Sequence, residues 1–384
     1  MRFWSKRLTL AAAGIAAGWL MTTVISNRAA AQAVASRPPT PKETAGHYFK
    51  NVQTEALKGL STDDFLSAMG VITDSLGLDC ADCHPGAGTD KVDWVVDTPP
   101  KRTARKMIDM VQAINKTHFG GAQDVTCFTC HHAREKPSTT VSLDALYSAP
   151  NMDKDDIVTP DKDQPAATAV LDRYIAALGG SQKLGGLKSY VMHGVSIGYE
   201  GLGGNGQFTV YANAPNQRTT DIRFPDHPDR APSIWTFDGK VGWVTAPRGL
   251  LGEYQLEGNN EAGAAFEAGM SFPQNIKSLF TNWRTGSMES IGDNDYLVVE
   301  GISTSVVAKL YFDAKTSLLT RVIRFVNSPV GRVPIQVGYS DYRDVNGIKF
   351  PFALEFLWLD GRYNAEIKSV DVNTAIDPKK FAKP

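Results

Sequence analysis

Two copies of one cysteine and histidine pattern constrain this chain more than any other feature of its sequence. All four cysteines of the 384-residue chain lie in Cys80–His84 (Cys-Ala-Asp-Cys-His) and Cys127–His131 (Cys-Phe-Thr-Cys-His). Each run is a CxxCH motif, in which two thiols bond to the porphyrin vinyl groups and the adjacent imidazole ligates the iron. The sequence therefore predicts two covalently bound haem c groups. The predicted attachment thiols and proximal iron ligands are Cys80, Cys83, His84, Cys127, Cys130 and His131.

Three other uses of paired cysteines agree less well with the sequence. A structural zinc site can combine two CxxC pairs, but here each pair is followed by its own histidine, and the pairs lie farther apart than in zinc ribbons. A thioredoxin-type redox pair is expected near a βαβ pattern, whereas the flanking residues have a helical pattern. Structural disulfides remain an alternative in an oxidising compartment.

The first residues have the composition of an export signal. The basic segment Met1–Arg7 is followed by the apolar run Leu8–Ile25 and then by small residues, with A-x-A cleavage sites after Ala31, Ala33 or Ala35. If the run is not cleaved, it has the minimum length that spans a bilayer and would form an N-terminal membrane anchor. We expect an exported, periplasmic protein. This agrees with the predicted haem, because c-type cytochromes are generally matured on the outer side of the energy-transducing membrane.

The charge balance excludes some partners. Forty basic and forty-one acidic side chains leave a net charge of −1, so the composition predicts no attraction to nucleic acid. Local patches of charge can still guide a redox partner. The expected partners are therefore redox proteins or a membrane electron-transfer complex.

A helix is predicted before each CxxCH motif, which makes the two units an internal repeat. The first begins at the capping run Ser61–Asp64, has an apolar stripe that includes Met69, and ends at Gly77. The second covers 101–116 and is followed by the loop Gly120-Gly121. A helix that ends just before its attachment turn can lie along the macrocycle and direct a side chain at the iron.

Methionines on these helices are the candidate distal ligands. Met69 is the only thioether on the first stripe, although plain core packing is the alternative for any methionine. In the second helix Met107 and Met110 lie one turn apart, and the sequence does not choose between them. His118 is a less favoured source of bis-histidine ligation, which would lower the reduction potential relative to His/Met ligation.

The region from about 45 to 135 resembles the cytochrome c subunit of photosynthetic reaction centres. The resemblance rests on runs that lead up to the two CxxCH motifs. They are Phe65–Met69 and Ser75–Cys80 for the first motif, and Ala104–Met110 and Val125–Cys127 for the second. It implies Met69 with His84 for one haem and Met107, slightly ahead of Met110, with His131 for the other. The family's reaction-centre member has four haem units and this chain has cysteines for two, so the photosynthetic role is not implied.

The second half of the chain has a different pattern of residues, typical of β strands rather than of helices. An acidic, proline-containing linker at 151–164 is followed by a helix at 165–178. Short alternating segments separated by turn residues then predict about eleven strands of a strongly curved antiparallel sheet. Helical turns around 262–268 and 272–281 are expected across one face. The predicted strands cover 190–199, 206–212, 217–222, 233–236, 241–245, 296–302, 308–313, 318–327, 335–344, 349–359 and 363–372.

This half resembles the lipoprotein-carrier half-barrel, an antiparallel sheet wrapped around a helix. The resemblance rests on turns and strand ends such as Phe237–Gly239, Leu310–Asp313, Tyr339–Arg343 and Gly347–Pro351. It implies an apolar interior that either holds a hydrophobic ligand or is filled by side chains. Because these motifs are structural, they assign no activity.

The sequence thus predicts a multidomain α plus β protein. Its parts are a signal or anchor at 1–35, a small helical di-haem cytochrome c domain at 42–150, the linker at 151–164 and a β half-barrel with packed helices at 165–384. With both irons six-coordinate, the expected activity is one-electron transfer without catalysis. The alternatives are a peroxidase-like di-haem enzyme with one open iron site, and a lipid- or quinone-binding protein with a redox module.

Overall fold

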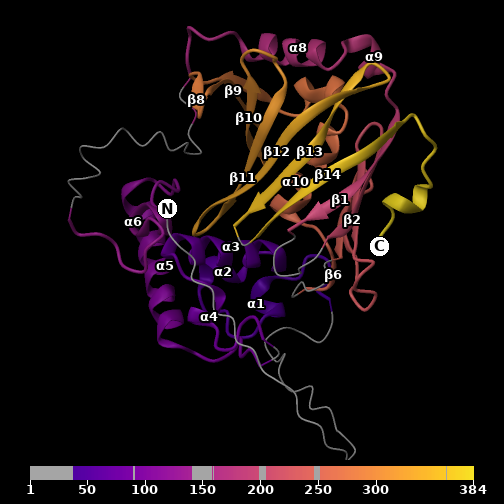
Figure 1. Ribbon diagram of the computed structural model, residues 1–384. Helices are drawn as coiled ribbons and strands as arrows, with labels where there is room; N and C mark the ends of the chain where they lie inside the picture. Colours follow the sequence, from indigo (N-terminus) through magenta and orange to yellow (C-terminus); the bar gives the residue numbers. More distant parts are fainter. Residues whose placement is uncertain are drawn as a thin grey trace, which may run out of the picture.

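The computed structural model describes residues 38–89, 91–140, 158, 160–198, 205–245, 251–359 and 361–384. The predicted signal or anchor at 1–35 lies outside these residues, as does most of the linker. Among the described residues, no helix is both long and apolar enough to cross a membrane. Figure 1 shows a helical N-terminal part at one end of a large, curved β sheet.

Six helices form the described residues of the N-terminal part. They are α1 (Ala45–Tyr48), α2 (Glu55–Lys58), α3 (Thr62–Leu76), α4 (Cys80–Cys83), α5 (Pro99–His118) and α6 (Cys127–His131). Helix α3 has the predicted ends, because the Ser61 hydroxyl accepts a hydrogen bond from the Asp64 N–H and Gly77 adopts a left-handed conformation at φ 65°. The sequence also predicts a single helix at 46–57, and this prediction is wrong, since Asn51 has φ 67° and the chain forms two short helices on either side of it.

The rest of the chain forms one antiparallel sheet of fourteen strands among the described residues. Their order is β6-β5-β4-β3-β2-β1-β14-β13-β12-β11-β10-β9-β7, with β8 paired to β9. All eleven predicted strands are present, and the prediction missed β6, β7 and β8. The bounds are β1 (Ser189–Ile197), β2 (Gly206–Asn213), β3 (Gln217–Arg223), β4 (Ser233–Phe237), β5 (Gly242–Thr245), β6 (Glu253–Gln255), β7 (Asn282–Thr285), β8 (Glu289–Ile291), β9 (Asn294–Ile302), β10 (Val307–Asp313), β11 (Leu319–Ser328), β12 (Gly331–Val345), β13 (Ile348–Trp358) and β14 (Gly361–Val372).

The sheet curves around a helix, as the half-barrel expectation requires. Helix α10 (Gly258–Met270) contacts β3, β4 and β5 on one side and β11 on the other, although these strands are far apart in the sheet order. At the centre of the sheet, a Cβ atom on Gly194 would lie 2.2 Å from the Glu366 carbonyl oxygen, so only glycine fits at this register shift between β1 and β14.

Helices close the open side and fill the main core. Helices α8 (Ala167–Ala177) and α9 (Ser181–Gly185) lie at the end of the sheet away from the N-terminal part (Figure 1). The 3₁₀ helix η1 (Pro273–Ser278) follows α10, and η2 (Pro378–Phe381) lies near the C-terminus. The core combines side chains from the strands with those from α8 and the α10 region, including Leu171, Phe208, Phe272 and Phe312, all fully buried. The fold class predicted from the sequence is therefore confirmed.

Two apolar clusters join the helical part to the sheet. One combines Leu57, Ala68, Val71, Ile72 and Ile108 of the helical part with Val326, Val330 and Val333 of the β11–β12 region. The other combines Ala45, Tyr48 and Phe49 with Val244, Leu251, Tyr254 and Leu256. Most of the buried apolar surface of the helical part is therefore shared with the sheet, and burial of apolar surface is the dominant stabilising contribution to folding.

A buried carboxyl group lies at this junction. The Tyr254 hydroxyl donates a hydrogen bond to Asp63 Oδ1 over 3.1 Å, while Asp63 Oδ2 is buried without a partner. Burial raises the pKa of Asp63 from 3.8 to about 6, and the neighbouring Asp64 carboxylate adds to the shift.

We predict that Asp63 makes the protein less stable as the pH rises from about 4 to about 7. Between the unfolded and folded pKa values the folded state binds more protons, so the free energy of unfolding falls by up to about 3 kcal/mol over this range. Asp63→Asn should remove this part of the pH dependence in denaturant titrations, while Asp371→Asn, which changes an exposed carboxylate, should not. Equal pH dependence in wild type and Asp63→Asn would contradict the assignment.

Candidate haem-attachment sites

The first CxxCH motif forms a single turn of helix, α4, that is held at both ends. The Asp79 side chain accepts hydrogen bonds from the Ala81 and Asp82 N–H groups, and the Asp82 carboxylate accepts one from the Asp79 N–H, which makes a capping box. The Thr98 hydroxyl, at the start of α5, donates to the Cys83 carbonyl oxygen over 3.0 Å. The two thiols are therefore presented from a turn whose backbone is fixed by local contacts.

His84, directly after this turn, is half-buried and held in its neutral form. Its ring lies 5.0 Å from the Trp94 ring between centroids. Burial lowers the pKa of His84 to about 4, and the nearby Lys101 charge adds to the effect. A neutral imidazole is the form that ligates a metal. Its Nδ1 atom is buried without a hydrogen-bond partner among the described residues.

The second motif forms the corresponding turn, α6, with Thr126 as its cap. The Thr126 hydroxyl accepts from the Thr129 N–H, and the Thr129 hydroxyl accepts from the Thr126 N–H. His131 Nδ1 lies 2.9 Å from the Arg134 carbonyl oxygen. Because a carbonyl can only accept, Nδ1 carries the proton and Nε2 keeps its lone pair, which is the arrangement that orients a metal-ligating histidine.

Long-range contacts hold this second turn in place. The Asn115 amide, buried in α5, donates to the Val125 carbonyl over 2.7 Å and accepts from the Val125 N–H over 2.9 Å. The Ala133 N–H donates to the Ser75 carbonyl at the end of α3. A Cβ atom on Gly77 would lie 2.4 Å from the Ala133 carbonyl oxygen, so Gly77 both ends α3 and allows this approach. The sequence did not predict this role of Asn115, because no local pattern shows that its amide bonds to the backbone of Val125.

The two units share neighbours in the folded chain. Helix α6 packs against α3, the helix of the first unit, as well as against α5, and α4 also packs against α5. Figure 1 shows α6 and α4 at different heights along α5. The two units predicted as an internal repeat are therefore packed together in one helical part rather than as two separate modules.

The four cysteines differ in their environments. None of them forms a disulfide in the structure; Cys80 and Cys130 are exposed, and Cys83 and Cys127 are partly buried. Burial raises the pKa of Cys83 and Cys127, whereas catalytic thiols have a lowered pKa. In the part of the chain that the structure describes, no three or more His, Cys, Asp or Glu side chains are grouped as metal ligands.

Exposed apolar side chains are frequent in the helical part that contains the motifs. Of the six large hydrophobic residues that are exposed in the described chain, four belong to the helical part: Val96, Met110, Phe119 and Phe128. Phe128 lies inside the second motif and is 49% exposed. A porphyrin is a large apolar group, and its attachment at the second motif would cover apolar surface such as that of Phe128. The residues present therefore fit covalently bound haem.

The candidate distal ligands have different environments. Met69 is partly buried and packs, like Cys127, against the cluster of Val71, Ile72 and Ile108. Met107 is partly buried, Met110 is 43% exposed, and His118 is exposed near the end of α5. His47 contacts the Glu43 carboxylate over 2.7 Å. The assignment of Met69, Met107, Met110 or His118 as iron ligands stays a prediction.

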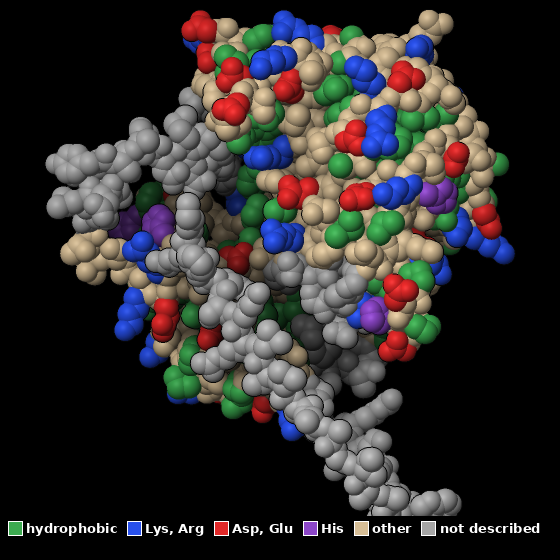
Figure 2. All heavy atoms as spheres, in the orientation of Figure 1, with side chains coloured by type: hydrophobic (Ala, Val, Ile, Leu, Met, Phe, Trp, Pro, Cys, Tyr) green, Lys and Arg blue, Asp and Glu red, His purple; other side chains and the backbone are tan. Residues whose placement is uncertain are grey.

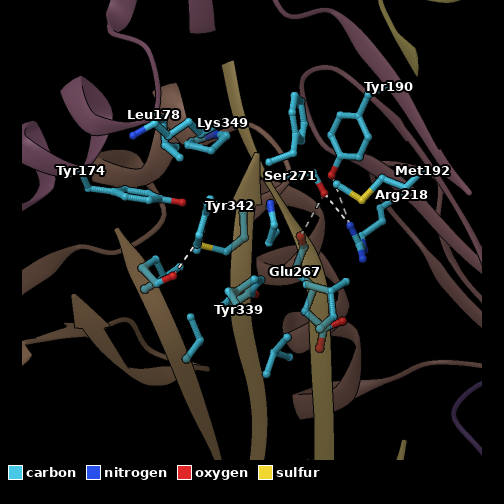
Figure 3. Close-up of a pocket in the computed structure, with 18 of the residues that line it drawn as sticks. Tyr174, Leu178, Tyr190, Met192, Arg218, Glu267, Ser271, Tyr339, Tyr342 and Lys349 are labelled. Carbon is cyan, nitrogen blue, oxygen red and sulfur yellow. Dashed lines mark hydrogen bonds between the residues drawn. The ribbon is translucent and has the colours of Figure 1, made fainter. Parts of the chain in front are cut away.

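The β domain has a cavity of its own, of about 100 Å³. Apolar side chains form most of its wall, and Figure 3 shows Tyr190, Ser271 and Arg218 together at one side. Arg218 Nη1 donates to the Ser271 hydroxyl over 3.0 Å and to the Tyr190 hydroxyl over 3.4 Å. Tyr342, on another wall, donates to the Leu319 carbonyl. The cavity is thus mostly apolar, with polar side chains, among them Glu267 and Arg324, at parts of its wall.

Comparison with solved structures finds chains similar to the β domain at low identity. A LolA superfamily protein from Nitrosomonas europaea is 16% identical, with a TM-score of 0.37, over 57% of this chain and 99% of that chain. A DUF1329 family protein from Desulfovibrio piger is 12% identical, with a TM-score of 0.40, over 57% of this chain and 98% of that chain. No curated protein sequence matches this chain significantly.

Comparison with protein families bears on the N-terminal part, where both CxxCH motifs lie. The match covers less than half of the chain and extends beyond the helical part on both sides. Residues 13–171 match the family described as the photosynthetic reaction centre cytochrome C subunit, so the resemblance indicated by the two haem-attachment units is confirmed for this part of the chain.

Proposed function

We propose that this chain is an exported di-haem c-type cytochrome that transfers single electrons between redox partners. The observation that carries the proposal is the pair of capped CxxCH turns, each of which ends in a histidine suited to metal ligation. The family match of residues 13–171 supports a cytochrome-like electron-transfer role.

Each residue type has one role in this proposal. The four cysteines tether the two porphyrins, and His84 and His131 ligate the irons. When bound, haem iron changes oxidation state by one electron. A methionine on each preceding helix, Met69 and either Met107 or Met110, would fill the distal position, raise the potential relative to bis-histidine ligation and exclude small ligands.

The proposed partners are redox proteins or a membrane electron-transfer complex outside the cytoplasm. The basic and apolar N-terminal segment supports export. Acidic and basic side chains are interspersed over the face of the β domain in Figure 2. With a net charge of −1, this pattern favours a partner matched by shape and local charge pairs rather than by one large charged patch.

A second candidate function is binding of a hydrophobic ligand in the β domain. The cavity supports it, because apolar walls surround the polar group formed by Arg218, Ser271 and Tyr190. At about 100 Å³ it is smaller than the ~150 Å³ cavity that binds benzene in an engineered protein, so a long chain would require it to widen. Mass spectrometry of an organic extract of the purified full chain tests this candidate; extracts that contain no lipid or quinone would count against it.

We predict that Met69→Leu turns one haem high-spin and shifts its reduction potential. Leucine keeps the apolar volume in the α3 cluster but removes the thioether, so packing is preserved while iron ligation is lost. Absorption spectra and a redox titration measure the effect. Met288→Leu, at an exposed site in the β domain, is the matched control and should behave as wild type. Unchanged spectra in Met69→Leu would rule out Met69 as a ligand.

We predict that Cys83→Ala and Cys130→Ala each weaken the attachment of one haem only. Each variant removes one of the two thioether bonds at its own motif and leaves the other motif complete. Mass spectrometry of proteolytic peptides that contain residues 80–84 or 127–131 locates the change. A variant that keeps both haems fully attached through two thioether bonds each would exclude that cysteine from attachment.

Carbon monoxide separates the carrier from the peroxidase-like alternative. If both irons have a distal protein ligand, the reduced wild-type protein should bind carbon monoxide slowly or not at all. Rapid binding to one haem, seen as a spectral change on mixing, would instead favour a di-haem enzyme with an open site.

A further inference from the structure

The tip of one β hairpin is buried in the helical part of the chain. Strands β11 and β12 are joined by the two-residue turn Pro329–Val330, closed by the pair Ser328 and Gly331. Connections between strands normally lie in solvent, yet Val330 is only 1% exposed. Both strands contact α3, and Figure 1 shows them ending beside it.

Three successive carbonyl groups of this tip are bound by the second haem-attachment unit. The Cys127 N–H donates to the Val330 carbonyl over 3.2 Å. The Gln112 side chain of α5 donates to the Pro329 carbonyl over 2.6 Å, and the Gln123 side chain donates to the Ser328 carbonyl. These bonds satisfy carbonyl groups that burial would otherwise leave without partners. The first residue of the motif is therefore bonded directly to the β domain.

Apolar packing fixes the same contact. Val330 belongs to the cluster with Val71, Ile72 and Ile108, against which Cys127 also packs. A Cβ atom on Gly331 would lie 2.9 Å from Val71 Cγ1, so the hairpin approaches α3 as closely as a glycine allows. The first motif has a different support, because the Thr98 hydroxyl that bonds to Cys83 comes from within the helical part. The two motifs thus differ in what holds them.

We propose that the hairpin tip Ser328–Gly331 is a positioning element of the second haem site. It fixes the Cys127 end of the attachment turn relative to α3 and α5, the helices that carry the candidate distal ligands, and so sets the ligation and reduction potential of one haem only. The inference rests on the proposed function. Covalent attachment itself needs only the CxxCH sequence, so the tip acts on the environment of the haem after attachment.

Two variants and a matched control test the role of the tip in the full chain with both haems attached. Gln112→Ala/Gln123→Ala removes the two side-chain hydrogen bonds to the Pro329 and Ser328 carbonyl groups and leaves the residues of the sheet and of the motif unchanged. Pro329→Asn/Val330→Gly keeps a turn that favours hairpins and removes the buried valine side chain. Gln217→Ala is the control, because its side chain donates in the same way to the Asp238 carbonyl in the β4–β5 turn.

The expected result is a change confined to one haem. Both tip variants keep two haems per chain, shift one of the two midpoints in a redox titration, and speed cyanide binding to that haem about tenfold or more. Amide hydrogen exchange at Cys127 increases by a similar factor, since its N–H loses a fixed acceptor. Gln217→Ala matches wild type in all three measurements.

Three results in the variants and one in the wild type would overturn the proposal. Faster Cys127 exchange with both midpoints unchanged would limit the tip to a structural role, and equal shifts at both haems would indicate general loosening. A wild-type chain without haem would overturn the proposed function as well, whereas unchanged variants of a wild type with two haems would overturn this inference alone. If Pro329→Asn/Val330→Gly does not fold, the glutamine variant decides.

Discussion

The interface between the helical part and the end of the β sheet is the feature on which the rest of the structure depends. The helices of the N-terminal part are short, apart from α3 and α5, and their buried apolar side chains pack in clusters that include residues of β5, β6, β11 and β12. Short helices are marginal alone and gain stability mainly from tertiary packing. The sheet is therefore both a domain with its own core and the support on which the haem-attachment unit is built.

Because the helical part depends on the sheet, the two similar CxxCH motifs differ in which elements support them. The two turns α4 and α6 are capped alike. In each one, the side chain of the residue before the helix accepts a hydrogen bond from the N–H of the third helical residue, and the side chain of that third residue accepts one in return. Their surroundings differ, because α4 is held by the start of α5 while α6 is held by α3, by Asn115 and by the β11–β12 hairpin. The same two strands also line the β-domain cavity through residues such as Val322 and Val337. One attachment turn thus shares its support with that cavity.

Local chemistry could be predicted from the sequence and long-range contacts could not. The ends of α3 at Ser61 and Gly77 and eleven of the strands follow from caps and alternation, and these were confirmed. The helix predicted at 46–57 is wrong because no proline or glycine marks the positive φ at Asn51. Strands β6 and β8 have three residues each, too few for alternation to appear, and β7 has only four. Asn115 and Val330 act across the chain on Val125 and Cys127, so no local pattern marks them.

The central claim is that each CxxCH turn carries one haem through two thioether bonds. The most direct measurement is a pyridine haemochrome spectrum of the denatured full chain, made in a host with a working cytochrome-maturation apparatus, together with protein quantification and a haem-stained denaturing gel. The account predicts two haem c groups per chain that remain with the polypeptide after denaturation. Colourless protein, or haem that separates from the chain on denaturation, would contradict it.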